Sequence, residues 1–218
     1  MASSAELVKE LRERTGAGVM DCKAALEASK GDLQGAVEHL RKKGLADAAK
    51  KQHREAKDGL VHAYIHPGSK IGVLVEVNCE TDFVARTDEF QKLVRDLAIQ
   101  VAGMAPLYVE AESIPADVLE AKKAELLADE SVQKKPEAIR PQIVEGQLKK
   151  WYSQVCLYDQ PFRDEERTVR DLITEKIATI GENIQVRRMA SMESANTIGA
   201  YVHGGRIGVL VEVKGGNA

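Results

Sequence analysis

The sequence predicts an α+β fold in which small sheets alternate with helices. The first 44 residues carry apolar positions at helical spacing, and several later segments show the same stripe. A strand-rich stretch also occurs twice, at residues 63–77 and 200–213, with 11 of 14 aligned positions identical when one gap is placed at the turn. We expect a helical module (1–45), a helical linker (46–58), a first core half (59–114), a helical hairpin arm (115–155) and the remaining core with the second repeat (156–218).

Bulk composition indicates a folded chain without a membrane segment. The 218 residues are 44% hydrophobic, which is enough for real cores. The formal net charge of −3 gives no overall attraction to nucleic acid or to an anionic membrane. No apolar run approaches the ~20 residues of a membrane span, and the first residues lack the core of a secretory signal. We therefore expect a cytoplasmic protein with no direct nucleic-acid partner and no membrane partner.

The first 44 residues predict three helices. Ser3 and Glu6 have the spacing of a capping box, and glycines separate this helix from a second one over residues 20–28. Asp32 stands where it can cap a third helix, and Gly44 is expected to end it.

The next elements are a linker, a hairpin and a helix. Residues 45–58, rich in Ala and Lys, predict a helical linker. Strands are expected at residues 60–65 and 71–77. The second strand has apolar residues at both odd and even positions, as in a strand buried on both faces. A further helix begins at Asp88 and closes before Pro106, with its apolar side against the hairpin. Its stripe consists of Phe90, Leu93, Val94, Leu97 and Val101.

Residues 115–155 predict two charge-rich helices, over 115–130 and 136–155, joined by residues 131–135. The apolar residues expected to face one another are Leu119, Leu126 and Leu127 with Ile139, Ile143 and Trp151. Such an arm adds little to the core, so a contact role and a plain solvated insertion are both compatible with the pattern.

The last part of the chain predicts a helix, a strand and the second hairpin. The helix begins at Thr168 and ends at Gly181, and a strand comes next over residues 184–189. No helical pattern succeeds the second repeat, so we expect its apolar strand to pair with the core, to pair with a second chain, or to belong to a shortened form of a longer protein. The sequence therefore leaves a homodimer open.

Common catalytic signatures are absent from the sequence. There is no phosphate-binding loop, dinucleotide fingerprint, metalloprotease motif or nucleophile elbow. His66 and His203 recur beside the two hairpin turns, and two histidines fall short of a usual zinc ligand set. The three cysteines are widely separated, which predicts reduced thiols. We expect no catalytic residues, no metal and no cofactor.

The two repeats differ in the segment that comes after each of them, and function is expected in that difference. Only the first copy continues into Asn78 and then Thr81, Asp82, Phe83 and Val84. In one interpretation Phe83 tucks beneath the hairpin and Asp82 caps a turn within a loop. In the other, these two side chains form a projecting finger that enters a pocket on another protein, as aromatic anchors do at interfaces.

Three motifs in order resemble elongation factor Ts over nearly the whole chain. They are TGAGVMDCKAAL at residues 15–26, NCETDFV at 78–84 and IGENIQVRR at 180–188. The resemblance implies a ubiquitin-associated-like module at the N-terminus. It also implies a guanine-nucleotide exchange factor of elongation factor Tu, in the bacterial cytoplasm or in an organellar matrix or stroma, that acts without covalent chemistry.

The same resemblance implies roles for particular residues. The segment of Thr81, Asp82, Phe83 and Val84 would enter the GDP-bound partner near its Mg²⁺ site, disturb the phosphate loop and release GDP. The factor would then stay on the nucleotide-free form until GTP binds. The N-terminal module would grip the partner through Arg12, Val19 and Met20, and His203 would approach the partner's third domain.

Two other classes of function compete with an exchange factor. A ubiquitin-type binding adaptor built on residues 4–44 would leave the Asp82 and Phe83 finger unexplained. A small hydrolase using Cys79, His66 and Asp82 would need an activated thiolate at Cys79.

Overall fold

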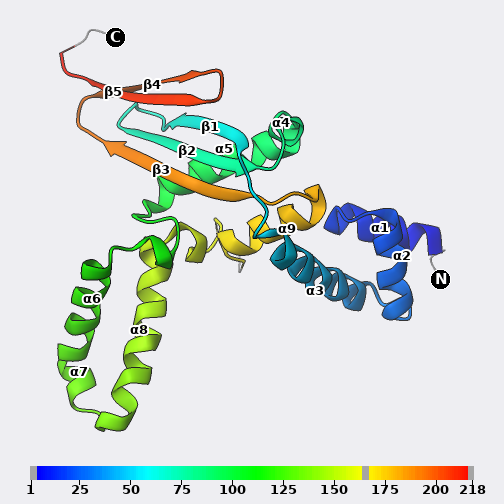
Figure 1. Cartoon of the computed structure of the whole chain (residues 1–218), viewed down its shortest axis with the longest axis horizontal. Helices are drawn as coiled ribbons and strands as arrows, with labels where there is room; N and C mark the ends of the chain where they lie inside the picture. The colour runs from blue at the N-terminus through cyan, green and yellow to red at the C-terminus, as the bar shows by residue number, and fades with distance from the viewer. Residues whose placement is uncertain (1–3, 164–166, 216–218) are drawn as a thin grey trace. The chain divides into compact units, whose positions relative to one another are not determined.

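The computed structural model describes residues 4–163 and 167–215, and it confirms an α+β fold of helices with small antiparallel sheets (Figure 1). The chain forms two compact units that interleave along the sequence. The first unit is built from residues 1–59, 78–90 and 171–185, and the second from residues 60–77, 91–170 and 186–218.

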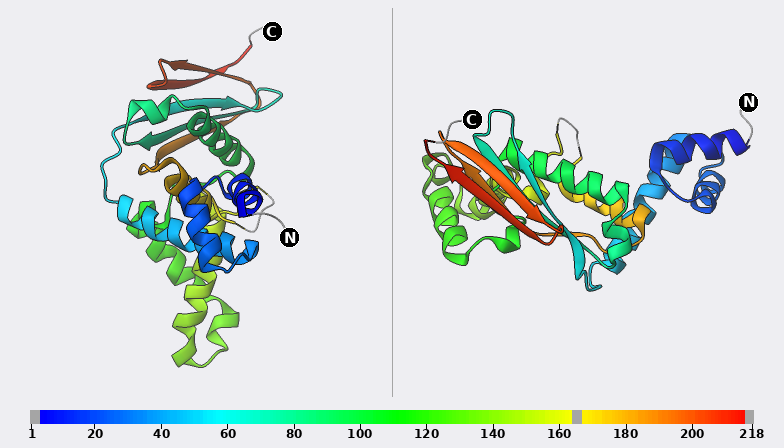
Figure 2. Two further views of the ribbon diagram at one scale, coloured as in Figure 1. Left: turned by 90° about the vertical axis from the view of Figure 1, so that its right-hand side faces the viewer. Right: turned by 90° about the horizontal axis from the view of Figure 1, so that it is seen from above.

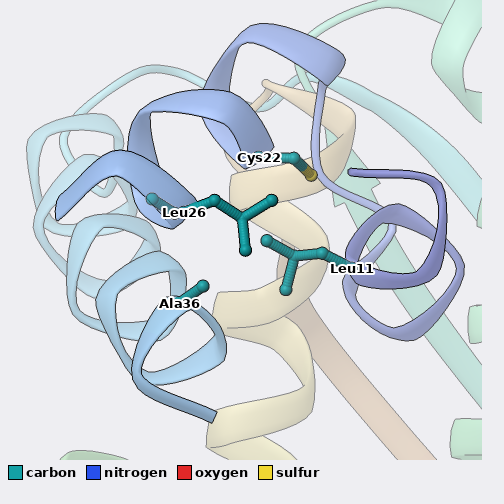
Figure 3. Close-up of a cluster of buried hydrophobic side chains, with 5 residues drawn as sticks. Leu11, Cys22, Leu26 and Ala36 are labelled. Atoms are coloured by element: carbon teal, nitrogen blue, oxygen red, sulfur yellow. The ribbon is translucent and has the colours of Figure 1, made fainter. Parts of the chain in front are cut away.

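The first unit contains the expected three-helix module. Its helices are α1 (Ser4–Thr15), α2 (Val19–Ala28) and α3 (Leu33–Lys51). Asp32 caps α3, since its carboxylate accepts the Gly35 N–H at 2.6 Å. The predicted partner of Glu6 in a capping box, Ser3, lies outside the described residues. Between the helices a small apolar core is closed by Leu11, Cys22, Ala25, Leu26 and Ala36 (Figure 3).

The prediction that Gly44 ends the third helix is wrong, because α3 continues through it to Lys51. A glycine inside a helix costs about 1 kcal/mol relative to alanine. Here it has a packing reason, since a Cβ at Gly44 would lie 3.0 Å from the Cβ of Ala178 in α9 (Val169–Ile180). The expected helical linker is therefore helical only to Lys51, and residues 52–57 connect α3 to the first strand without regular structure.

The second unit is built on a three-stranded sheet. Its strands are β1 (Asp58–Ile65), β2 (Ile71–Cys79) and β3 (Gln185–Glu193), with β2 in the centre. The hairpin predicted from the first repeat is confirmed. Three alternate valines of the central strand, Val73, Val75 and Val77, have no exposed surface.

One face of this sheet is covered by α5 (Asp88–Met104), which lies alongside the strands in Figure 2. The predicted stripe is buried to within 2% exposure at Phe90, Leu93, Val94, Leu97 and Val101. On β1, burial and then the positive charge of Arg95 in α5 lower the pKa of the His62 imidazole.

The second repeat forms its own hairpin on the opposite face of the sheet (Figures 1 and 2). Strands β4 (Thr197–His203) and β5 (Ile207–Val213) pair antiparallel, with Tyr201 opposite Val209. Backbone hydrogen bonds tie this hairpin to the first one: the Val61 N–H donates to the Gly205 carbonyl and the Ile198 N–H to the Ser69 carbonyl, each at 2.8 Å.

The two hairpins pack reciprocally through equivalent glycines. A Cβ at Gly72 would lie 3.1 Å from Leu210 Cδ2, and a Cβ at Gly208 would lie 2.8 Å from Leu74 Cδ2. Gly72 is equivalent to Gly208 in the repeat, and Leu74 to Leu210. Such paired contacts are those of an approximate two-fold axis, here inside one chain.

The arm consists of α6 (Ala116–Ala128), α7 (Glu130–Gln133) and α8 (Arg140–Val155), with three short 3-10 turns, Ala111–Ser113, Glu137–Ile139 and Leu157–Asp159, nearby. The predicted pair of helices is confirmed, but the connection is partly helical and buries Val132 completely. Val132 fills the space between α6 and α8 together with Val144 and Leu148. Leu127 and Ile139, expected there, are instead each 41% exposed, because the α7 turn occupies the interior in their place.

Candidate partner-binding site

The segment after β2 forms α4 (Asp82–Ala85), a single helical turn where the sequence predicted a loop. Thr81 caps this turn: its hydroxyl oxygen accepts the Val84 N–H at 3.4 Å. Ala85 is buried on the inner side of the turn. The turn is thus capped at its start by Thr81 and buried at its end at Ala85.

Phe83 lies on the outer side of this turn and is 80% exposed, more than any other large hydrophobic residue in the described ranges. The interpretation in which Phe83 tucks beneath the hairpin is therefore wrong. An aromatic ring held in water on a short, capped turn can bury a large area on binding, with only two side-chain torsions to fix.

The neighbouring residue, Asp82, has a carboxylate that is accessible to solvent and also forms an ion pair. Its side chain is 43% exposed, and Arg86 Nη2 lies 2.7 Å from its Oδ2 one helical turn later. An exposed ion pair of this kind contributes only about 0.3–0.5 kcal/mol. Asp82 can therefore change partners at little cost.

The turn is held at its base by a residue that the sequence patterns did not single out. Glu182 Oε2 accepts the N–H groups of Glu80 and Thr81, each at 3.0 Å, and its Oε1 accepts the Thr81 hydroxyl at 2.6 Å. The only signal in the sequence was that Glu182 falls within one of the three motifs that carry the family resemblance. Nothing in its spacing pointed to a contact with Thr81.

The residues expected to grip a partner through the N-terminal module are all exposed. Arg12 lies on α1, and Val19 and Met20 are the first two residues of α2, with exposures of 43% and 74% for the latter two. Their neighbours Leu11 and Cys22 point into the module's core (Figure 3). The first unit thus carries both the finger segment and these three residues.

A family model described as elongation factor TS matches residues 46–172 and 163–218. The elongation factor Ts of Carboxydothermus hydrogenoformans is 54% identical over 191 residues, covering 87% of this chain and 88% of that protein. That of Anaeromyxobacter sp. is 58% identical over 189 residues (86% of each chain), and that of Moorella thermoacetica 56% over 187 residues (85% and 92%). The chain belongs to the elongation factor Ts family.

Membership in the elongation factor Ts family places the chain in the elongation stage of protein biosynthesis, among guanine-nucleotide exchange factors. The family model begins at residue 46, so its match is carried by the sheets, α5, the arm and the finger segment. A binding adaptor built on residues 4–44 alone would not account for that match.

The structure also removes the hydrolase alternative. Cys79 is fully buried, and burial, with a further contribution from Glu182, raises the pKa of its thiol to about 11. The thiol donates to the Thr81 carbonyl at 3.2 Å. A thiol with such a pKa is protonated at neutral pH, so Cys79 is no nucleophile. Cys22 and Cys156 are likewise buried free thiols, as predicted.

His203, the remaining predicted contact residue of this elongation factor Ts homologue, belongs to the second unit. It is exposed, and its Nδ1 lies 3.0 Å from the hydroxyl of Tyr201. The equivalent pair in the first repeat, Tyr64 and His66, is joined at 3.2 Å. The recurrence of histidine beside both turns therefore coincides with a repeated tyrosine–histidine hydrogen bond.

The described ranges hold neither a metal cluster nor a membrane-spanning helix. No cluster of three or more His, Cys, Asp or Glu side chains in residues 4–163 and 167–215 is arranged to hold a metal ion. Over those same ranges, no helix has both the length and the apolar character that crossing a membrane requires.

Proposed function

We propose that this chain binds elongation factor Tu in its GDP-bound form and promotes GDP release. It remains on the nucleotide-free partner until GTP binds, in the cytoplasm of a bacterium or in an organellar matrix or stroma. The observation that carries this proposal is Phe83, held 80% exposed on a capped helical turn that comes after only one of two otherwise similar hairpins. A ring in that position serves no purpose in the chain's own core.

The finger acts on the two features by which a GTPase holds its nucleotide, the phosphate loop and the bound Mg²⁺. Phe83 inserts as an aromatic wedge and stabilises an alternative packing of the partner around its nucleotide site. Asp82 exchanges its weak pairing with Arg86 for groups that order the water shell of the metal. Thr81 and Val84 hold the two side chains in place by capping the turn.

Affinity comes from elsewhere in the same unit. Arg12, Val19 and Met20 present a cation and two apolar side chains on the N-terminal module, and methionine adapts its shape to irregular surfaces. His203 adds a contact with the partner's third domain. Because bound nucleotide and bound factor weaken one another equally, GTP binding releases the factor. This cycle needs no proton donor, nucleophile or cofactor.

A second copy of the chain is a further partner, through the outer face of the β4–β5 hairpin. That face carries no charged side chain, in a chain that is 30% charged, and β5 exposes an apolar row along it. The face consists of Thr197, Gly199, Tyr201, His203, Ile207, Val209, Val211 and Val213. Sedimentation velocity should show a dimer that Val211→Glu converts to monomer, and a concentration-independent monomer in the wild type would refute this pairing.

The exchange activity is tested by the release of a fluorescent GDP analogue from elongation factor Tu into excess unlabelled GDP. Wild type should accelerate release, and Phe83→Ala should lose roughly a hundredfold of that acceleration, as expected for an aromatic hot spot. Leu107→Ala is the matched control, because Leu107 is also a large apolar residue that is 67% exposed, and it belongs to neither proposed contact surface. No acceleration by the wild type, or equal loss in both variants, would contradict the proposal.

A further inference from the structure

The finger is attached to the rest of its unit through a short segment that comes directly after α9. Gly181 ends that helix with φ 89°, a left-handed conformation that glycine adopts without strain, and turns the chain toward Glu80 and Thr81. Glu182 and Asn183 come next, and both form hydrogen bonds to residues about a hundred positions away. These contacts lie within the first unit.

The Glu182 carboxylate does two things at once. It accepts two consecutive backbone N–H groups, from Glu80 and Thr81, and so fixes the path of the chain into α4. It also accepts the hydroxyl proton of Thr81, which leaves an oxygen lone pair on that hydroxyl for the Val84 N–H. Because these are hydrogen bonds to a charged acceptor, they are stronger than neutral ones.

A carboxylate suits this arrangement better than an amide does. It offers two acceptor oxygens, and all three groups that point at Glu182 are donors. A glutamine side chain has nearly the same shape but replaces one oxygen with an NH₂ group, which is itself a donor. With the glutamine oxygen on the backbone N–H pair, its NH₂ group would donate to the Thr81 oxygen, and the hydroxyl proton of Thr81 would lose its acceptor. The two backbone N–H groups would also lose a charged acceptor, so the support of the α4 cap would weaken.

A reciprocal contact joins the same segment to the N-terminal module. The Glu80 carboxylate accepts the Asn183 N–H at 2.6 Å. The side-chain amide of Asn183, which is 3% exposed, donates to the carbonyl of Arg54 at 2.7 Å and to that of Gln52 at 3.4 Å. Gln52 and Arg54 come just after α3, the third helix of the module. Glu182 and Asn183 thus hold the base of the finger and the end of the module in one hydrogen-bonded network.

We propose that Glu182 is a positioning residue for nucleotide exchange: its carboxylate sets the Asp82 and Phe83 turn at a fixed place relative to the end of α3. The inference rests on the proposed exchange function, which it deepens. Glu182 touches no nucleotide and acts through the orientation of Phe83, while Arg12, Val19 and Met20 supply the grip. Its loss therefore affects how fast the bound partner releases GDP, and leaves the strength of binding nearly unchanged.

The test is a concentration series of the GDP-release assay with wild type, Glu182→Gln, Phe83→Ala and the double variant. Glu182→Gln should lower the saturating release rate roughly tenfold, because it removes hydrogen bonds to a charged group, with little change in the half-saturating concentration. In the Phe83→Ala background the same change should have no further effect, since the ring through which it acts is gone.

Glu89→Gln is the matched control, because it removes a carboxylate of the same unit that pairs with Lys176 of α9 at 2.7 Å rather than with the finger. It should leave the saturating rate unchanged. Amide hydrogen exchange gives an independent readout: Glu182→Gln should speed exchange at Thr81 and Val84, while exchange in α2 stays as in the wild type.

Several outcomes would overturn the positioning role. An unchanged saturating rate in Glu182→Gln, beside a slow Phe83→Ala, would refute it while the exchange function stands. A further loss in the double variant would show that Glu182 acts by another route. If Glu182→Gln fails to fold, Thr81→Val, which replaces the hydroxyl with a methyl group, must reproduce the loss of saturating rate or the inference fails. A wild type without activity would instead remove the exchange function itself, and with it this role.

Discussion

Val73, Val75 and Val77 of the first repeat are fully buried, whereas their equivalents Val209, Val211 and Val213 are between 43% and 51% exposed. The two strands have the same apolar sequence, so the difference comes from their surroundings. After the first copy the chain continues into α4 and α5, and α5 covers the valines. After the second copy no described element covers them.

This comparison separates two uses of one hairpin. The first copy is the centre of a core and leads directly into the exposed Phe83. The second copy covers the other face of the same sheet and leaves its own outer side open. Both copies of the strand thus make the same inward contacts, through Gly72 and Gly208, while only the first copy continues into the segment that we propose to act on elongation factor Tu.

The largest expected effect on stability is a difference between two equivalent positions of the repeats, when the valine at each is replaced by alanine. Val75→Ala should destabilise the chain by about 2 kcal/mol, because it opens a cavity in a filled core. In the monomer, Val211→Ala should change the free energy of unfolding by no more than about 0.5 kcal/mol, since the side chain is half exposed within the single chain. Urea denaturation measures both. At protein concentrations that keep the chain monomeric, equal losses would mean that the outer face of β5 is covered within a single chain.

An effect of similar size is expected where the two copies touch. Gly72→Ala and Gly208→Ala should each cost about 1–3 kcal/mol, since the added Cβ would lie 2.7 Å from Ile198 and 2.8 Å from Leu74. Gly199→Ala is the control, because nothing lies within 4 Å of its Cβ position. The melting temperatures of the three variants, measured by thermal denaturation, test this packing. A harmless Gly208→Ala would contradict the packing of the second hairpin on the first.

The smallest expected effect is a pH dependence that only the first copy has. His62 occupies the position of Gly199 in the second copy, and burial lowers the pKa of His62 below its ordinary value of 6.5. The His62 imidazole therefore binds a proton more readily in the unfolded chain than in the folded one. The contribution of the neutral His62 imidazole to the free energy of unfolding is fully present above pH 6.5. It is lost as the pH falls through 6.5 toward the lower folded-state pKa.

His62→Gln should make the melting temperature depend less on pH between pH 7 and pH 5.5. These two values lie on the neutral and the acid side of the unfolded-state pKa. The measurement is a series of thermal melts of wild type and variant. A parallel decline of both proteins with falling pH would show that other groups carry the dependence.

Local patterns predicted the elements that depend on local chemistry. The stripe from Phe90 to Val101 predicted α5, and Asp32 predicted the start of α3. Features that depend on distant partners were missed. Gly44 continues a helix because Ala178 packs against it, and Leu127 is exposed because Val132 takes the interior of the arm.

The candidate site shows the same division. The absence of Asp82 and Phe83 from the second repeat marked the finger as a place to look, but composition left the exposure of Phe83 undecided between two interpretations. Glu182 could not be found from spacing, since its bonds to Thr81 join residues 101 positions apart. Only the folded chain brings that carboxylate to the base of the finger.

The central claim is that Phe83 drives GDP release while the N-terminal module supplies the grip. The most direct test is a stopped-flow concentration series of GDP release from elongation factor Tu with wild type, Phe83→Ala and Met20→Ala. We expect Phe83→Ala to lower the saturating rate at nearly unchanged half-saturation, and Met20→Ala to raise the half-saturating concentration at nearly unchanged saturating rate. A Phe83→Ala variant that reaches the wild-type rate at high concentration would contradict the account.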